Sequence, residues 1–166
     1  MLVHPRCARE TAEDLEEVRM MIDAGEMEIA FDELRWILAD CAENIGAHVL
    51  LGELAAEKGD FPLARGHYGA GYQLGLQTLR RAKFPKPLLY SQPANQTFFE
   101  AGRGLIGCLE KVGQPQMANE VVATLVELDP SDPLELRGMV DALRTGGAPV
   151  VELSLDLPKK EEQGNV

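Results

Sequence analysis

The sequence predicts an all-α fold, and three observations lead to that prediction. Aromatic residues make up only 5 % of the chain, whereas alanine, leucine and glutamate are abundant, which favours helices over strands. Apolar residues recur three and four positions apart between glycine or proline breaks. The breaks also recur, because Gly25 and Gly59 lie 34 residues apart, as do Ala30 and Ala64. We therefore expect antiparallel helix pairs that repeat along the chain.

The first pair is expected within residues 11–44, after an irregular lead-in over residues 1–10. Thr11 is the expected N-cap of the first helix, and acidic residues occupy its first turn. Its apolar stripe consists of Leu15, Val18, Met21 and Ile22. Gly25 ends this helix, and a second runs from residue 26 to about residue 42. One face of the second helix is expected to hold Ile29, Ala30, Leu34, Ile37 and Leu38, with Trp36 beside it.

The second pair is expected within residues 45–78. An apolar helix over about 44–58 reaches Gly59, and Asp60 is the expected N-cap of the next helix. Pro62 falls in the first turn, where its missing N–H costs little. The glycines of this next helix are Gly66, Gly69, Gly71 and Gly75. We expect them to let a neighbouring element approach closely, because their spacing is not that of a dinucleotide-binding loop.

A third pair is expected within residues 99–132, after an insertion of about 20 residues at 79–98. Gly113 is its turn, and Ala118 follows at the same distance as Ala64 follows Gly59. A single capping helix is expected over 133–144, with Asp132 as cap, Pro133 at the first position and Glu135 reaching back. The tail, residues 145–166, alternates apolar and polar residues around Leu153. It is interpreted either as a disordered end or as a strand that pairs with a second copy or docks on apolar surface.

The segment 45–78 resembles the tetratricopeptide repeat family. Gly52 matches the small residue of that family's first helix, and Gly59-Asp60 matches the turn between its helices. Ala64, Tyr68 and Gly71 match the small, aromatic and small positions of its second helix, whereas His48 stands where tryptophan is frequent. The resemblance covers about residues 11–144. It implies a short right-handed α-solenoid that serves as a protein-binding scaffold.

Composition and charge exclude several classes of function. The net charge of −11 disfavours nucleic acid and anionic membrane surfaces as partners. No apolar run is long enough to span a bilayer, and no signal peptide is expected. Three widely spaced cysteines, Cys7, Cys41 and Cys108, argue against a disulfide framework. We therefore expect a cytoplasmic protein with reduced cysteines, of which Cys41 and Cys108 are small buried apolar residues.

No catalytic residues, cofactor or metal site are predicted. Nothing in the sequence resembles a nucleophile motif, and histidines and cysteines form no short-spaced zinc pair. His48 and His67 lie on paired helices and could approach each other, as structural histidines or, less readily, as ligands. The chain is accordingly expected not to be an enzyme.

Two sets of residues are candidates for binding a partner. The repeat pattern places the first set on the inner surface: Arg19, Asp23, Val49, Glu53, Arg103 and Glu110. The second set is a basic cluster with a nearby tyrosine: Arg80, Arg81, Lys83, Lys86 and Tyr90. The cluster is interpreted either as favourable charge at a helix C-terminus or as a site for an acidic peptide or phosphate.

The function expected from these patterns is an adaptor or scaffold that binds a protein or peptide segment in its groove or at the insertion. The alternative is a regulatory subunit that binds a small anionic ligand near Arg80, Arg81, Lys83 and Lys86. A homodimer through the tail or through an exposed helix face is a further expectation.

Overall fold

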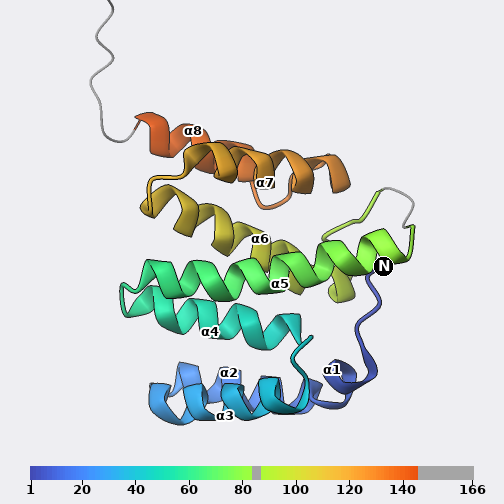
Figure 1. Ribbon diagram of the computed structural model, residues 1–166, viewed down its shortest axis with the longest axis vertical. Coiled ribbons are helices and arrows are strands. Elements are labelled where there is room, and N and C mark those ends of the chain that lie inside the picture. Colours follow the sequence, from blue (N-terminus) through green and yellow to red (C-terminus); the bar gives the residue numbers. More distant parts are fainter. Residues whose placement is uncertain (84–86, 146–166) are drawn as a thin grey trace, which may run out of the picture.

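The computed structural model describes residues 1–83 and 87–145, and every regular element in these ranges is an α-helix (Figure 1). The helices are α1 (Arg6–Glu10), α2 (Ala12–Asp23), α3 (Met27–Asp40), α4 (Ile45–Glu57), α5 (Phe61–Arg81), α6 (Pro93–Lys111), α7 (Pro115–Leu128) and α8 (Leu136–Thr145). The predicted all-α class is confirmed. Lys86 and the alternating tail from residue 146 lie outside the described residues.

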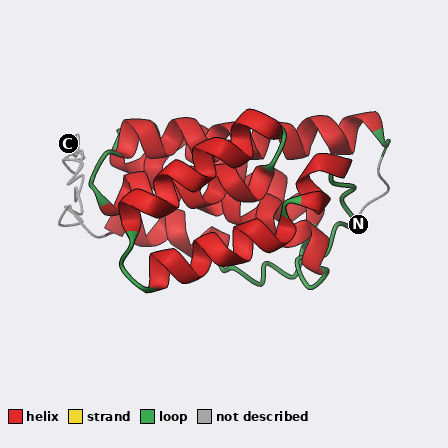
Figure 2. Ribbon diagram, turned by 90° about the horizontal axis from the view of Figure 1, so that it is seen from below, coloured by secondary structure: helices red, strands yellow, loops and turns green. Residues whose placement is uncertain are grey.

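The helices follow one another along the long axis of the molecule, from α2 and α3 at one end to α8 at the other (Figure 1). Seen along that axis they overlap in one bundle of roughly parallel and antiparallel rods (Figure 2). Each helix from α2 to α8 packs against the next, and α4 also packs against α6. Within the described ranges, no helix is both long and apolar enough to cross a membrane.

Three turns between paired helices share one geometry. Gly25, Gly59 and Gly113 have φ values of +80°, +77° and +76°, in the left-handed region that glycine adopts without strain. The residue after each glycine donates its N–H five positions back, to Met21, Ala55 and Leu109 respectively. These are the two features of a Schellman cap, which satisfies the last carbonyls of the preceding helix. The predicted role of the three glycines is therefore confirmed.

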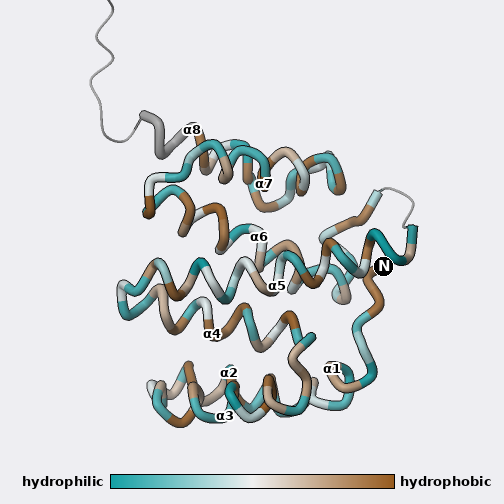
Figure 3. Tube along the Cα trace, in the orientation of Figure 1, coloured by the Kyte–Doolittle hydropathy of each residue, from teal (hydrophilic) through white to brown (hydrophobic). Residues whose placement is uncertain are grey.

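Helix α4 lies between two hydrophobic cores. Its Ala47, Leu50, Leu51 and Leu54 pack with residues of α2 and α3, and its Ile45 and Val49 belong to the larger core of α5 to α8. Apolar residues accordingly lie all round this helix, and several positions along its trace are brown in Figure 3. Asn44 caps it, because its Oδ1 accepts from Ala47 N–H at 3.0 Å.

Where helices cross, glycines leave space that aromatic rings of the neighbouring helix occupy. Tyr68 of α5 lies against Gly52 of α4 and Gly104 of α6, where a Cβ on either glycine would overlap its ring. Gly75 of α5 meets the ring of Phe98 in the same way. The expectation of close approach is right for Gly71 and Gly75. It is wrong for Gly66 and Gly69, which face open space or a single distant contact.

The N-terminal segment packs against distant parts of the chain. Residues 6–10 form α1, and Leu2 is only 2 % exposed in the larger core. The fully buried Asn95 of α6 accepts from Leu2 N–H at 2.7 Å and donates to Leu89 O at 2.7 Å. His4 Nε2 lies 2.7 Å from Ala94 O. The predicted irregular lead-in is right for residues 1–5, which have no regular secondary structure, and wrong for residues 6–10. The burial of Leu2 was not predicted, because the partners of Leu2 and His4 are about ninety positions away.

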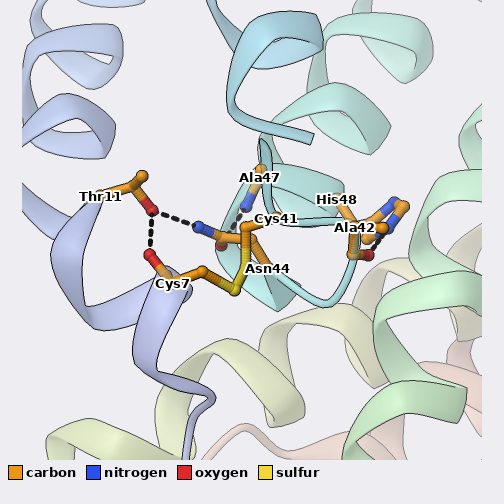
Figure 4. The surroundings of a disulfide bond; sticks show 7 residues. All are labelled: Cys7, Thr11, Cys41, Ala42, Asn44, Ala47 and His48. Carbon is orange, nitrogen blue, oxygen red and sulfur yellow. Dashed lines mark hydrogen bonds between the residues drawn. A yellow bond between two sulfur atoms is a disulfide. The ribbon is translucent and has the colours of Figure 1, made fainter. Parts of the chain in front are cut away.

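Cys7 and Cys41 form a disulfide that ties α1 to the end of α3 (Figure 4). Their Cα atoms are 5.6 Å apart, a normal separation for this bond. Cys108 remains a free, buried thiol. The prediction of reduced cysteines is therefore wrong for Cys7 and Cys41, since an odd count of three also allows one bonded pair and one free thiol. Thr11 is the N-cap residue of α2, as predicted, but its hydroxyl donates to Cys7 O and accepts from Asn44 and makes no capping hydrogen bond to the helix.

The predicted insertion is divided between two helices and a linker. Residues 79–81 prolong α5, residues 93–98 begin α6, and the described part of the linker lies against the end of α7. Leu88 N–H donates to Leu128 O at 2.8 Å, and Tyr90 N–H donates to Asp129 Oδ2 at 2.8 Å. Asp129 also accepts from the hydroxyl of Ser131 at 2.6 Å. These bonds fasten the linker to α7.

Helix α8 begins later than predicted. Pro133 and Glu135 precede it, and Asp132 and Glu135 have left-handed φ values of +46° and +52°. Asp132 does cap the helix, but its carboxylate accepts from Leu136 N–H at 2.8 Å, with a weaker contact to Arg137 N–H. Residues 133–135, which were predicted to form the first turn of the helix, therefore belong to a tight turn that precedes it.

One predicted core face on α3 is partly exposed. Ala30, Leu34 and Ile37 are buried, but Ile29 is 57 % exposed. Trp36, seven residues later and so on the same side of the helix, is 71 % exposed. The prediction for Ile29 was wrong because the buried stripe of α3 is narrower than the run of apolar residues.

Two glycine substitutions on α5 should have opposite effects. A Cβ at Gly75 would lie 2.8 Å from Phe98 Cε2, so Gly75→Ala should lower the free energy of unfolding by about 1–3 kcal/mol. Gly66 has nothing within 4 Å of an added Cβ, so Gly66→Ala should raise it by about 0.5–1 kcal/mol through helix propensity. Urea denaturation measures both, and equal effects would contradict the close packing at Phe98.

Replacing Asp129 should lower the free energy of unfolding more at neutral pH than at acidic pH. Burial alone would raise the pKa of Asp129, but the hydrogen bonds from Ser131 and Tyr90 outweigh it and lower the pKa. Because the folded pKa is depressed, the stabilisation is present above the unfolded pKa of about 3.9 and is lost as pH falls below it. We expect Asp129→Asn to cost about 1–3 kcal/mol at pH 7 and less at pH 3. Denaturant titrations at both pH values measure this, and a pH-independent cost would contradict the assignment.

Candidate partner-binding grooves

The predicted inner-surface residues are only partly brought together. Arg19 and Asp23 of α2 meet Glu53 of α4 around a small hollow of about 170 Å³. Val49 is 1 % exposed and lies in the core, so it cannot contact a partner. Arg103 and Glu110 lie on α6 and do not line this hollow.

Carboxylates crowd the inner surface near Glu53. Loss of hydration raises the pKa of Glu53, the charge of Arg19 lowers it, and the charges of Glu100 and Glu57 raise it further. The net shift is upward. One carboxylate oxygen of Glu110 is buried with no hydrogen-bond partner among the described residues. This face offers mixed charge and little apolar surface.

The basic cluster is divided between two sides of α5. Arg80 and Lys83 line a hollow of about 310 Å³ toward α7, together with Thr124, Glu127 and Leu128. Arg81 lines a different hollow, of about 410 Å³, against the N-terminal residues 2–5. Adjacent helical residues point about 100° apart, so four clustered cations need not face one ligand. The predicted single anion site is therefore not formed by Arg80 and Arg81 together.

Tyr90 has a packing role. Its ring makes an edge-to-face contact with Phe99 at a centroid distance of 5.9 Å, and its half-buried side chain packs against the larger core. Its backbone N–H is held by Asp129. Tyr90 therefore fastens the linker, and it lines neither of the hollows that hold Arg80 and Arg81.

An apolar groove lies between α5 and α7, with α6 as its floor. Its volume is about 480 Å³. The apolar lining comes from Leu76, Leu105, Leu109, Met117 and Val121. Met117 is 51 % exposed and so presents apolar surface at the groove. The sequence interpretation did not identify this groove.

Gly66 and Gly69 form part of the groove wall on α5. An added Cβ at Gly66 would meet nothing within 4 Å, and one at Gly69 would meet only Leu105 Cδ1 at 3.9 Å. These two glycines keep the groove open because larger side chains there would project into it. Their three-residue spacing, which places both on one helix face, is the sequence signal that points to this wall, whereas the lack of a packing partner is visible only in the structure.

The groove continues into the hollow that contains Arg80 and Lys83. The two share Leu76 and Thr124, which lie opposite each other on α5 and α7. Arg65 lies at the other end, where its guanidinium donates to Gln114 Oε1 at 3.3 Å. From Arg65 to the end of α5 at Arg81 the groove follows about 24 Å of helix, and Lys83 lies just beyond. We call this whole surface, between Arg65 and Lys83, the α5–α7 groove.

His48 of α4 and His67 of α5 lie side by side, as expected. The ring centroids of His48 and His67 are 5.9 Å apart, and His48 Nε2 lies 3.2 Å from Ala42 O. In the part of the chain that the structure describes, no group of three His, Cys, Asp or Glu side chains could hold a metal.

Burial raises the pKa of the Cys108 thiol, so less of it is present as the reactive thiolate.

Comparison of the chain with protein-family models, with curated proteins and with solved structures finds no match in any of the three.

The histidine pair should make the fold sensitive to mild acid. Burial lowers the pKa of His48 against the opposing effect of its Ala42 contact, and burial plus the charge of His48 lowers the pKa of His67. A lowered folded pKa means that stability is lost as pH falls below the unfolded value of about 6.5. We expect His67→Gln to reduce the loss of stability between pH 7 and pH 5. Glu53, whose pKa is also shifted, is present in both the wild type and the variant, so the difference between their pH profiles of stability reports on His67. Parallel pH profiles would contradict this prediction.

Proposed function

We propose that this chain is a non-catalytic protein-interaction module that binds an extended, partly apolar segment of a partner protein in the α5–α7 groove. The observation that carries the proposal is the combination of an open apolar floor with polar ends. The half-buried Leu76 and the 51 % exposed Met117 supply apolar surface that a partner could contact, and the buried Leu105, Leu109 and Val121 lie beneath them. Arg65 and Lys83 mark the two ends.

The shape of the groove favours a peptide over a compact ligand. It is elongated along two helices, whereas small-molecule sites enclose most of their ligand. An extended peptide places alternate side chains about 6.5–7 Å apart on one face, so four of them span about 20 Å and fit a groove of about 24 Å. The opposite side chains and the peptide ends would face solvent and the polar rim.

The architecture that presents this groove is, in our proposal, a short right-handed stack of helix pairs of the tetratricopeptide type. The three equivalent glycine turns support it, as do the fully buried Ala30, Ala64 and Ala118, each five residues after its glycine. In such a stack the second helices α5 and α7 are neighbours, and the residues between α5 and α6 would space them apart.

Other parts of the interaction proposal have less support. The hollow with Arg80 and Lys83 also contains Glu127, whose charge opposes a small anionic ligand. A homodimer through an exposed helix face would use the side of α3 with Ile29 and Trp36. A cytoplasmic location is proposed from composition, and the Cys7–Cys41 disulfide weighs against it because such bonds are rare in reducing compartments.

Selection of 12-residue peptides from a random display library against the full chain tests the groove. We expect binders with apolar residues at alternate positions, and we expect Gly69→Phe to reduce their affinity at least about tenfold by filling the groove. Gly107→Phe is the matched control, because Gly107 also has nothing within 4 Å of an added Cβ. It lies between Arg103 and Glu110, on the opposite side of α6 from Leu105 and Leu109.

Each outcome of this comparison is decisive. Loss of binding only in Gly69→Phe supports the α5–α7 groove. Loss only in Gly107→Phe moves the site to the predicted inner surface, and loss in neither variant refutes both locations. Melting temperatures of both variants show that the chain still folds.

A further inference from the structure

The C-terminal tail of this chain has the pattern that the α5–α7 groove would accept. Val151, Leu153, Leu155 and Leu157 alternate with polar residues. In an extended conformation their side chains lie on one face and span about 20 Å. The apolar part of the groove, from Gly66 to Leu76 on α5, follows about 15 Å of helix and is continued by Leu79. The two lengths agree.

The tail also starts at the correct end of the groove. Helix α8 runs back along α7, so Thr145 lies at the end of the molecule that holds the α4–α5 and α6–α7 turns (Figure 1). Arg65 and Gln114, at the entrance of the groove, lie next to those two turns. From Thr145 to Val150 the chain can reach about 16 Å, which is more than the roughly 10 Å diameter of the one helix, α7, that it must pass.

Charge is compatible with the tail in the groove but does not select a direction. Residues 146–166 have four acidic and two basic side chains. The groove has Arg65 at one end and Arg80 and Lys83, with Glu127 beside them, at the other. Lys159 and Lys160 separate Leu157 from Glu161 and Glu162, so both signs of charge follow the apolar part of the tail.

We propose that residues 150–157 of the tail occupy the α5–α7 groove of the same molecule and cover it until a partner segment displaces them. The tail is then a built-in competitor for the binding site. Its effective concentration is high because a short connection from α8 holds it beside the groove, so a partner needs correspondingly greater affinity. Because the tail and a partner share one groove, this regulation rests on the proposed function.

Photo-crosslinking tests where the tail lies. The probe is p-benzoylphenylalanine placed at Met117 in the full chain, because Met117 lines the groove and is 51 % exposed. We expect crosslinks within one molecule to peptides containing residues 150–157, at a yield independent of protein concentration. The same probe at Trp36, which is 71 % exposed on α3 at the other end of the molecule, is the control and should not reach the tail.

The other results overturn the proposal in distinct ways. Crosslinked dimers whose yield rises with concentration would show that a second copy fills the groove. No crosslink to the tail from Met117, or equal crosslinking from Trp36, would show that the tail does not dock there.

A tail variant separates regulation from binding. Leu153→Asp with Leu155→Asp should release the groove, so a peptide selected from the display library should bind this variant at least about tenfold more tightly than wild type. Leu153→Ile with Leu155→Ile is the matched control and should change little. Equal affinity for wild type and the Asp variant would refute the competition while leaving groove binding intact. A tail crosslink with no peptide binder in either chain would instead refute the partner-binding function.

Discussion

The structure depends on the insertion of Tyr68 between two glycines. Its ring lies where a side chain on Gly52 of α4 or Gly104 of α6 would have to be, so three consecutive helices meet at one aromatic residue. A hydroxyl on a 7 % exposed ring is costly to ionise, and burial accordingly raises the pKa of Tyr68. The close approach of α4, α5 and α6 follows from this contact and from Phe98 against Gly75.

The tight packing of α5 on α4 and α6 has a consequence for α7. Leu125 of α7 packs against Gly102 of α6, which fixes α7 on the far side of α6. Helices α5 and α7 are thus both held by α6. Tyr72 of α5, which is only 4 % exposed, and Thr124 of α7 interact through their side chains and both line the α5–α7 groove.

The N-terminal end is stabilised in a different way, by polar bonds and a covalent link. Asn44 and Asn95 are both buried, and each uses its amide to join segments that are distant in sequence. The disulfide joins the same region. A buried amide without partners would cost about 1–3 kcal/mol, so these two residues specify the path of the N-terminal segment closely.

Much of the local structure could be predicted from the sequence. The helices, the cap at Asp60 and the turns at Gly25, Gly59 and Gly113 depend on residues within about five positions of each other, and all are found. Helix periodicity and the special conformations of glycine are properties of short segments, so a sequence pattern is enough to identify them.

The candidate site depended on tertiary structure. The approach of α5 and α7 to form a groove, the pairing of Cys7 with Cys41 and the burial of Leu2 against Asn95 all join residues from different helices. The division of Arg80 from Arg81 follows from the direction of each side chain relative to neighbouring helices. The sequence by itself therefore determined the helices and their turns, because those interactions are local. Only the packing of helices against each other decided which side chains are buried and which surface is left open.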